Sequence, residues 1–171
     1  MTNKRPAPEE CAPYYKRYID QVEGDDIIKI LEKEKEETTK FLESIPWDKW
    51  EHAYAEGKWT LAEVLMHLID GERIFAYRAL RIARNDQTPL PGFEQDDYVP
   101  FTEANKRLPA SIVREYQTVR DASLSLFSHF SDAMWERFGT ASNNPVTPLA
   151  LAYIIAGHEL HHLKIIKERY L

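Results

Sequence analysis

Cysteine is almost absent from this chain of 171 residues, since Cys11 is the only one. A single cysteine cannot form an internal disulfide, which is typical of proteins in a reducing compartment. The first ten residues are polar and contain proline, without the apolar run of a secretory signal peptide. The sequence also lacks a run of about eighteen apolar residues, the length that a membrane-spanning helix needs. These absences predict a cytoplasmic protein without a membrane segment.

Basic and glycine residues are also sparse. Lys and Arg number 22 against 28 Asp and Glu, and they form no basic stripe, so we expect no nucleic-acid partner. Glycine occurs 6 times, and strand-like alternation of polar and apolar residues is nearly missing, which favours helices. The length is that of one domain. We therefore expect a single domain over residues 1–171, with residues 1–13 as a flexible N-terminal segment.

The apolar spacing predicts four long helices, over residues 25–44, 60–84, 110–130 and 147–169. Thr60 and Glu63 form a T-x-x-E capping box at the start of the second helix. Thr147 followed by Pro148 is a typical start for the fourth. A short turn is expected near residues 131–137, and the Lys and Glu residues of the first helix are expected on a solvated face. The pattern predicts an all-α four-helix bundle with a long loop, residues 85–108, between helices 2 and 3.

The pattern H-E-x-x-H stands near the end of the chain, from His158 to His162. On a helix these two histidines lie one turn apart on the same face and could bind one metal ion. The residues after His162 are too few for the downstream third ligand of a zinc protease. His67, inside the apolar stripe of the second helix, is the best upstream candidate. The alternative is that these histidines are hydrogen-bonded core residues without a metal.

Three acids near these histidines are weaker candidates. Glu63 could orient His67 or act as a base, although its capping role explains it sufficiently. Asp70 and Glu159 could accept hydrogen bonds from ligand histidines, as carboxylates around metal sites do. Exposure to solvent is the simpler expectation for both.

His161 and Arg78 complete the candidates. His161 points about 60° away from His158 on an ideal helix, so it could replace His162, but a supporting or surface position is the simpler expectation. Arg78 continues the His67 stripe and could hold an anionic group of a substrate, although an ordinary ion pair explains it as well. Gly71, one turn after His67, could leave space beside that imidazole or simply let two helices approach closely.

Several of these motifs occur together in the order typical of one family. They are the stretch Gly57-Lys58-Trp59-Thr60 with Glu63, His67-Leu68 and Glu72-Arg73, then Pro89 to Phe93, Arg120, Thr147, and Gly157 to Leu163 with Glu168-Arg169-Tyr170. From about Tyr14 onward the chain resembles the DinB-like family. The resemblance implies a four-helix bundle, often a homodimer, that binds a divalent metal ion, commonly zinc or nickel, through His67, His158 and His162.

Characterised relatives in that family include transferases and isomerases that use small thiols, so the leading hypothesis is a metal-dependent transferase that joins such a thiol to a small-molecule substrate. The first alternative is a metal-dependent hydrolase of small esters or amides, with Glu159 as general base. The second is a non-enzymatic metal-binding bundle that acts by association, through aromatic residues such as Trp47, Trp50, Tyr54 and Trp59. The sequence identifies no catalytic side chain.

Overall fold

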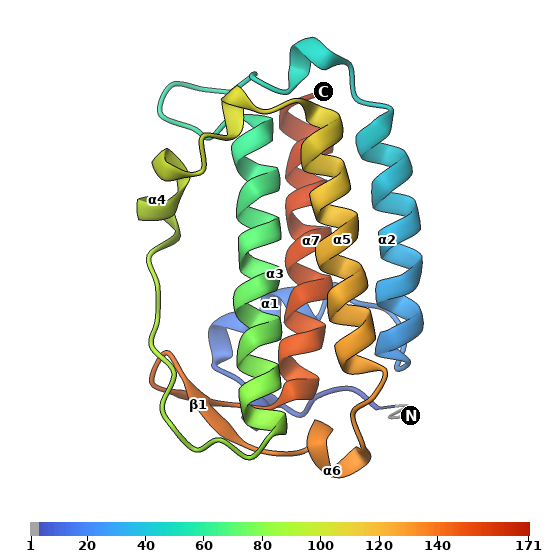
Figure 1. The fold of residues 1–171 in the computed structure, drawn as a ribbon, viewed down its shortest axis with the longest axis vertical. Helices are drawn as coiled ribbons and strands as arrows, with labels where there is room; N and C mark the ends of the chain where they lie inside the picture. Colours follow the sequence, from blue (N-terminus) through green and yellow to red (C-terminus); the bar gives the residue numbers. More distant parts are fainter. Residues whose placement is uncertain (1–3) are drawn as a thin grey trace.

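Four long helices run side by side along the molecule in the computed structural model, which describes residues 4–171 (Figure 1). They are α2 (Ile27–Glu43), α3 (Leu61–Ala83), α5 (Pro109–Phe127) and α7 (Pro148–Arg169). The short helices α1 (Lys16–Ile19), α4 (Gln95–Tyr98) and α6 (Asp132–Trp135) lie outside this set. The predicted all-α four-helix bundle is confirmed. No helix within residues 4–171 combines the length and the apolar character needed to cross a membrane.

Local capping interactions explain where the long helices begin. The side chain of Asp26 accepts a hydrogen bond from the backbone N–H of Lys29 at the start of α2. At the start of α3 both halves of the predicted Thr60–Glu63 capping box are formed. Thr147 caps α7 by accepting from the N–H of Ala150. These interactions satisfy backbone donors that have no partner within the first turn of a helix.

The directions of the helices account for the long connection after α3. In Figure 1, α2 and α7 run upward while α3 and α5 both run downward. Since α3 and α5 are parallel, residues 84–108 must return along the whole length of the bundle, about 30 Å for helices of this size. The lower part of this segment is held where the N–H of Leu90 donates to the carbonyl of Thr140 at 2.9 Å. Helix α4 forms the middle of this connection and lies beside α3 in Figure 1.

The structure contains a small β-hairpin between α6 and α7 that the sequence did not predict. Strand β1 (Gly139–Ala141) pairs antiparallel with β2 (Asn144–Val146). The two turn residues, Ser142 and Asn143, have φ values of 51° and 62°. Two-residue hairpin turns need such left-handed conformations and usually contain glycine. The Ser-Asn pair lacks that glycine, and three-residue strands are too short to show alternation.

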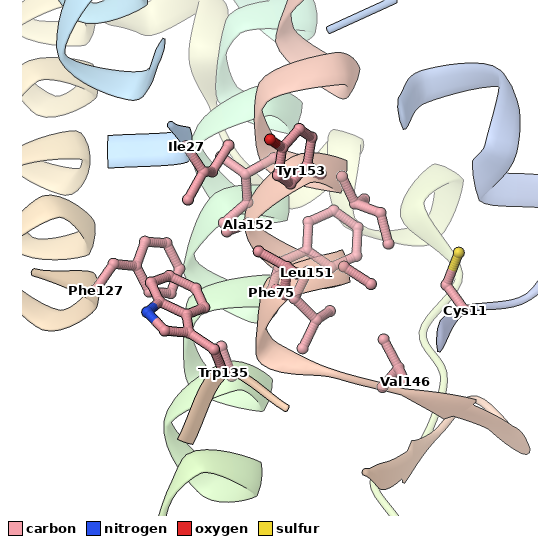
Figure 2. Packing of buried hydrophobic residues seen from close by; sticks show 14 of the residues in the cluster. Cys11, Ile27, Phe75, Phe127, Trp135, Val146, Leu151, Ala152 and Tyr153 are labelled. Atoms are coloured by element: carbon pink, nitrogen blue, oxygen red, sulfur yellow. The ribbon is translucent and has the colours of Figure 1, made fainter. Parts of the chain in front are cut away.

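Helix α7 forms the centre of the core. It packs against α1, α2 and α3, and consecutive residues from Pro148 to Glu159 are all buried. Figure 2 shows Leu151, Ala152 and Tyr153 of α7 within the packed cluster, with Phe127 and Trp135 nearby. A helix that is apolar on every side must be covered on every side. Its position therefore places the His158–His162 segment inside the bundle.

The segment before α1 contacts the bundle at several points. Arg5 donates to the carbonyls of Ile19 and Val22, and the Glu10 carboxylate accepts a hydrogen bond from Thr147 at 2.6 Å. Residues 1–3 of the expected flexible segment 1–13 lie outside the described residues. Among the aromatic residues considered for a dimer surface, Trp50 is 3% exposed and Trp47 is 62% exposed. The homodimer stays a prediction.

Candidate functional site

Three histidine rings converge between α3 and α7. The Nε2 atom of His158 lies 2.9 Å from Nε2 of His67 and 3.1 Å from Nε2 of His162. One ring nitrogen from each residue lies within 4.8 Å of the other two. The structure thus brings together the two histidines of the last helix and the upstream histidine that the sequence indicated.

Gly71 of α3 faces His158 of α7. A Cβ atom built on Gly71 would lie 3.4 Å from Cε1 and 3.6 Å from Nδ1 of His158. We expected Gly71 to leave space beside the imidazole of His67. The ring that lies beside Gly71 is instead that of His158. The reason is that His67 lies on the same helix as Gly71, whereas His158 faces it from α7.

Aromatic side chains enclose the three histidines. The ring of Trp59 lies 5.0 Å from that of His67, and the ring of Tyr18 lies 5.3 Å from that of His158, as measured between centroids. His67 and His158 are buried, while His162 is partly buried. Because Tyr18 belongs to α1, this short helix forms part of the wall of the site.

Burial keeps these imidazoles uncharged. It lowers the pKa of His67 to about 4 and that of His162 to about 3. The pKa of His158 falls well below its usual range, first because of burial and then because of the neighbouring His162 and His67. At neutral pH each ring therefore has a lone pair available for a metal ion. Three imidazole nitrogens bound to a tetrahedral zinc ion would lie about 3.3 Å apart, and the separations of 2.9 and 3.1 Å are a few tenths of an ångström shorter than that.

Two cavities reach the histidine cluster. One of about 220 Å³ is lined by His67, His158 and Arg78 among others. A second of about 440 Å³ is lined by His162 and Trp59 among others. Asp96 of α4 lines both cavities, and its charge opposes the effect of burial on the pKa of His67. Sequence reasoning missed Asp96 because it lies in the long connection, without helical spacing to link it to the histidines.

The other predicted candidates near the site have different positions. Glu63 accepts hydrogen bonds from the N–H of Thr60 and from Asn105, which agrees with its capping role. Asp70 is partly buried and pairs with Arg73 at 3.5 Å on the same helix. His161 is partly buried, and its ring lies 5.3 Å from that of Tyr18. None of the three contributes to the group of converging ring nitrogens found within residues 4–171.

Arg78 and Glu159 depart from the simpler expectations for them. Arg78 forms no ordinary ion pair with any carboxylate of residues 4–171, and it donates instead to the carbonyl of Pro91 and to Ser142. Glu159 is 2% exposed, so the expectation of solvent exposure is wrong. Its partners among the described residues include no histidine, because its direction along α7 differs from that of His158 by about 100°.

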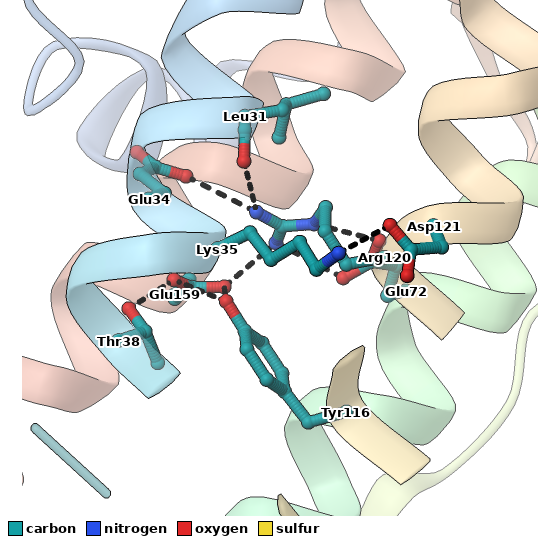
Figure 3. A network of polar contacts seen from close by, with 9 residues as sticks. All are labelled: Leu31, Glu34, Lys35, Thr38, Glu72, Tyr116, Arg120, Asp121 and Glu159. Carbon is teal, nitrogen blue, oxygen red and sulfur yellow. Dashed lines mark hydrogen bonds and ion pairs between the residues drawn. The ribbon is translucent and has the colours of Figure 1, made fainter. Parts of the chain in front are cut away.

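Glu159 belongs to a buried polar network around Arg120 (Figure 3). Arg120 is fully buried and donates to both carboxylate oxygens of Glu72, at 2.9 and 3.0 Å, and to Glu159 at 2.6 Å. Thr38 and Tyr116 also donate to Glu159. Both carboxylate oxygens of Glu159 are thus engaged inside the bundle.

The third acid of this network is Glu34 of α2, whose Oε2 lies 3.6 Å from Nη1 of Arg120. Burial, followed by the charge of Glu159, raises the pKa of Glu34 to about 8. The first helix was expected to place its Lys and Glu residues on a solvated face. That holds for Lys33 and Glu37, which pair at 3.8 Å on the surface, and it is wrong for Glu34. The error arises because the groups that surround Glu34, such as Arg120 of α5, are far from it in the sequence.

Comparison with known proteins places this fold. The model of the DinB superfamily matches residues 30–166. YfiT from Bacillus subtilis, described as a probable metal-dependent hydrolase with an unusual four-helix bundle topology, superposes with a TM-score of 0.73 at 20% identity, over 84% of this chain and 83% of that chain. The mycothiol-dependent maleylpyruvate isomerase superposes with a TM-score of 0.67 at 10% identity, over 86% of this chain and 61% of that chain. At such identities these two likenesses establish the fold alone. No curated protein matches this chain.

Proposed function

This chain belongs to the DinB superfamily, and we propose that it is a metal-dependent enzyme that transfers a small-molecule thiol to an electrophilic substrate. His67, His158 and His162 would hold a divalent ion, zinc or nickel. The convergence of three uncharged imidazole nitrogens beside two cavities carries the proposal. The likeness in fold to a mycothiol-dependent isomerase supports the thiol.

The two cavities suit a reaction of two small molecules. The larger one is lined by Tyr54, Trp59 and Tyr170 and would take the thiol compound, next to His162. The smaller one reaches His67 and His158 and would take the electrophile. Because both cavities touch the histidine cluster, the two reactants would approach each other there.

Asp96 would be the base that accepts the proton in this reaction. A bound divalent ion supplies positive charge, which lowers the pKa of a nearby thiol. As the sulfur forms its bond to the electrophilic carbon, the thiol proton must move to a base. The Asp96 carboxylate lines both cavities, so it would accept this proton and pass it to the product or to the leaving group.

Elemental analysis of the purified protein tests the metal site. The parent and the His161→Ala variant should each carry about one divalent ion per chain after incubation with zinc or nickel. His67→Ala and His162→Ala should lose it, because each removes one of the converging nitrogens. His161→Ala is the matched control, since its ring is adjacent in sequence but outside the cluster. A parent protein that binds neither metal would contradict the proposal.

Activity is tested by mixing the metal-loaded protein with bacillithiol, mycothiol or glutathione and a chromogenic aryl halide. The carbon–sulfur bond replaces the carbon–halogen bond, and halide and a proton are released. We expect conjugation only with metal present, and a loss of turnover in Asp96→Asn with the metal content unchanged. Conjugation at the same rate without metal would reject the transferase.

Hydrolysis of a small ester or amide is the second candidate, favoured by the likeness in fold to YfiT. Glu159 is poorly placed as its base, because Thr38, Tyr116 and Arg120 already bond its carboxylate. Asp96 would take that role instead. Turnover of an ester by the metal-loaded protein without any thiol would favour this candidate over the transferase.

A further inference from the structure

Arg78 is a buried cation without a carboxylate partner among residues 4–171. Its side chain is 4% exposed, and Nη2 donates to the carbonyl of Pro91 at 2.8 Å and to Oγ of Ser142 at 3.2 Å. Arg120, the comparable buried arginine, forms ion pairs with three carboxylates. A buried guanidinium without a counter-ion is unfavourable. A ligand that supplied the missing negative charge would therefore be attracted to Arg78.

The cavity beside Arg78 is the one that reaches the histidines. Its volume is about 220 Å³, and its wall includes His67, Gly71 and His158 as well as Arg78. His67 and Arg78 are both on α3, and eleven residues of helix span about 16 Å. Helical side chains tend to lean toward the N-terminus, and the Arg78 guanidinium lies over the ring of Phe75, one turn closer to His67. One molecule could thus contact the arginine at one end and the histidine cluster at the other.

The position of the Arg78 guanidinium suits the binding of a planar anion. Its central carbon lies 5.9 Å from the ring centroid of Phe75 and 5.8 Å from that of Phe93. Its hydrogen bonds to Pro91 and Ser142 come from Nη2, and Tyr15 is a further hydrogen-bond partner. Arginine has five N–H donors arranged as a fork that matches a carboxylate, so donors remain for a ligand. The side chain of Tyr15 lies beside the same guanidinium, which counteracts the burial that raises the pKa of Tyr15.

The charge at the buried end of this cavity favours an anion without a metal, and a bound divalent ion would add to it. Its charged lining residues are Arg78, Glu94 and Asp96, so the formal charge is −1 with neutral histidines. A divalent ion on the histidines changes this to +1. Glu94 and Asp96 are exposed, so the buried end of the cavity is the positive one.

We propose that Arg78 binds the carboxylate of a small organic acid, and that acids of this class are the substrates of the site. The assignment of this acid as a substrate rests on the proposed function, but its binding to Arg78 does not. In the complex, the carboxylate accepts hydrogen bonds from the guanidinium, and the rest of the molecule extends along the cavity toward His67 and His158. The acid group therefore selects and orients the substrate, while the reacting atom is a separate part of it.

The test uses metal-free protein, so that its result is independent of metal binding and turnover. Phenylacetate and its neutral counterpart phenylacetamide are titrated into the protein and followed by NMR chemical shifts, including the Nε–H signal of Arg78. We expect the acid to bind at least about tenfold more tightly than the amide, as hydrogen bonds to a charged group imply. In Arg78→Met this preference should disappear, and in Arg78→Lys it should weaken, because lysine lacks the fork.

Arg73→Met is the matched control. Arg73 lies on the same helix but is exposed and pairs with Glu115 at 2.7 Å, so its loss should leave the acid preference unchanged. Equal affinities for acid and amide in the parent would overturn the proposal even if Arg78→Met fails to fold. A preference that survives in folded Arg78→Met would overturn it too. A protein that prefers the acid but shows no metal-dependent turnover would retain this site and reject only the proposed function.

Discussion

Gly71 of α3 faces the imidazole of His158 on α7, and a methyl group at position 71 would lie 3.4 Å from Cε1 of that ring. Gly157, adjacent to His158 on α7, faces the backbone of α1 instead. A methyl group there would lie 2.1 Å from the carbonyl oxygen of Tyr18. Gly157 therefore permits a backbone contact with α1 that a side chain would block, whereas Gly71 leaves room for a methyl group in ordinary contact with the ring.

The substitutions Gly71→Ala and Gly157→Ala should have opposite effects on stability. At position 71 the new methyl group makes an ordinary contact, so the free energy of unfolding should stay the same or rise by up to about 1 kcal/mol through helix propensity. At position 157 the backbone of Tyr18 must move, and a loss of about 1–3 kcal/mol is expected from overpacking. Urea unfolding of both variants measures the difference. Equal stability of the two variants would contradict this account of the α1–α7 contact.

The pH dependence of stability should reveal the buried Glu34. Its pKa is about 8 in the folded protein, and the ordinary value is 4.5, so the folded state retains a proton that the unfolded chain releases. The stability that the protonated Glu34 contributes is fully present below pH 4.5 and is lost as the pH rises through about 8. Between these values the free energy of unfolding should fall by about 1.4 kcal/mol per pH unit. Burial contributes most to this raised pKa, the charges of Glu159 on α7 and Glu72 on α3 add to it, and the charge of Arg120 on α5 opposes it.

Glu34→Gln should remove this slope, because glutamine cannot lose a proton. Urea unfolding at several pH values between 5 and 8 should show the parent losing stability relative to the variant as the pH rises. Glu37→Gln, on the exposed side of the same helix, is the control and should follow the parent. Parallel curves for the parent and Glu34→Gln would mean that Glu34 is ionised throughout this range.

Removing Arg120 should be among the most damaging single changes. Arg120→Met leaves Glu72 and Glu159 buried without their cation, and breaking a buried ion pair in this way costs about 3–5 kcal/mol. Arg114→Met, at an exposed position on the same helix, should change the unfolding free energy by less than about 0.5 kcal/mol. Adding Glu72→Gln and Glu159→Gln to Arg120→Met should recover part of the loss. Absence of recovery would show that packing, and not charge, makes Arg120 important.

Local patterns were sufficient to predict the four long helices but not the short helices α1 and α4. The Thr60–Glu63 box and the Thr147–Pro148 start act within one helical turn, so the sequence itself contains the interacting groups. The spacing of His158 and His162 on one face follows from helix geometry alone. The β-hairpin escaped prediction because its turn depends on the left-handed conformations of Ser142 and Asn143, which their residue types merely permit.

Whether each charged residue is buried or exposed was decided by the tertiary structure. Glu34, Glu159 and Arg78 each looked like an ordinary surface or paired residue, and all three are buried. Whether a charge is buried depends on the partners that other helices bring to it, and those partners are far away in the sequence. Arg120 forms ion pairs with acids from α2, α3 and α7, while Arg78 borders a cavity and forms no ion pair with a carboxylate among the described residues. The sequence by itself determined the helices and the direction of the histidines, since these follow from interactions within a turn or two. Only the packing of the helices decided which charges are neutralised inside the protein and which one faces a cavity.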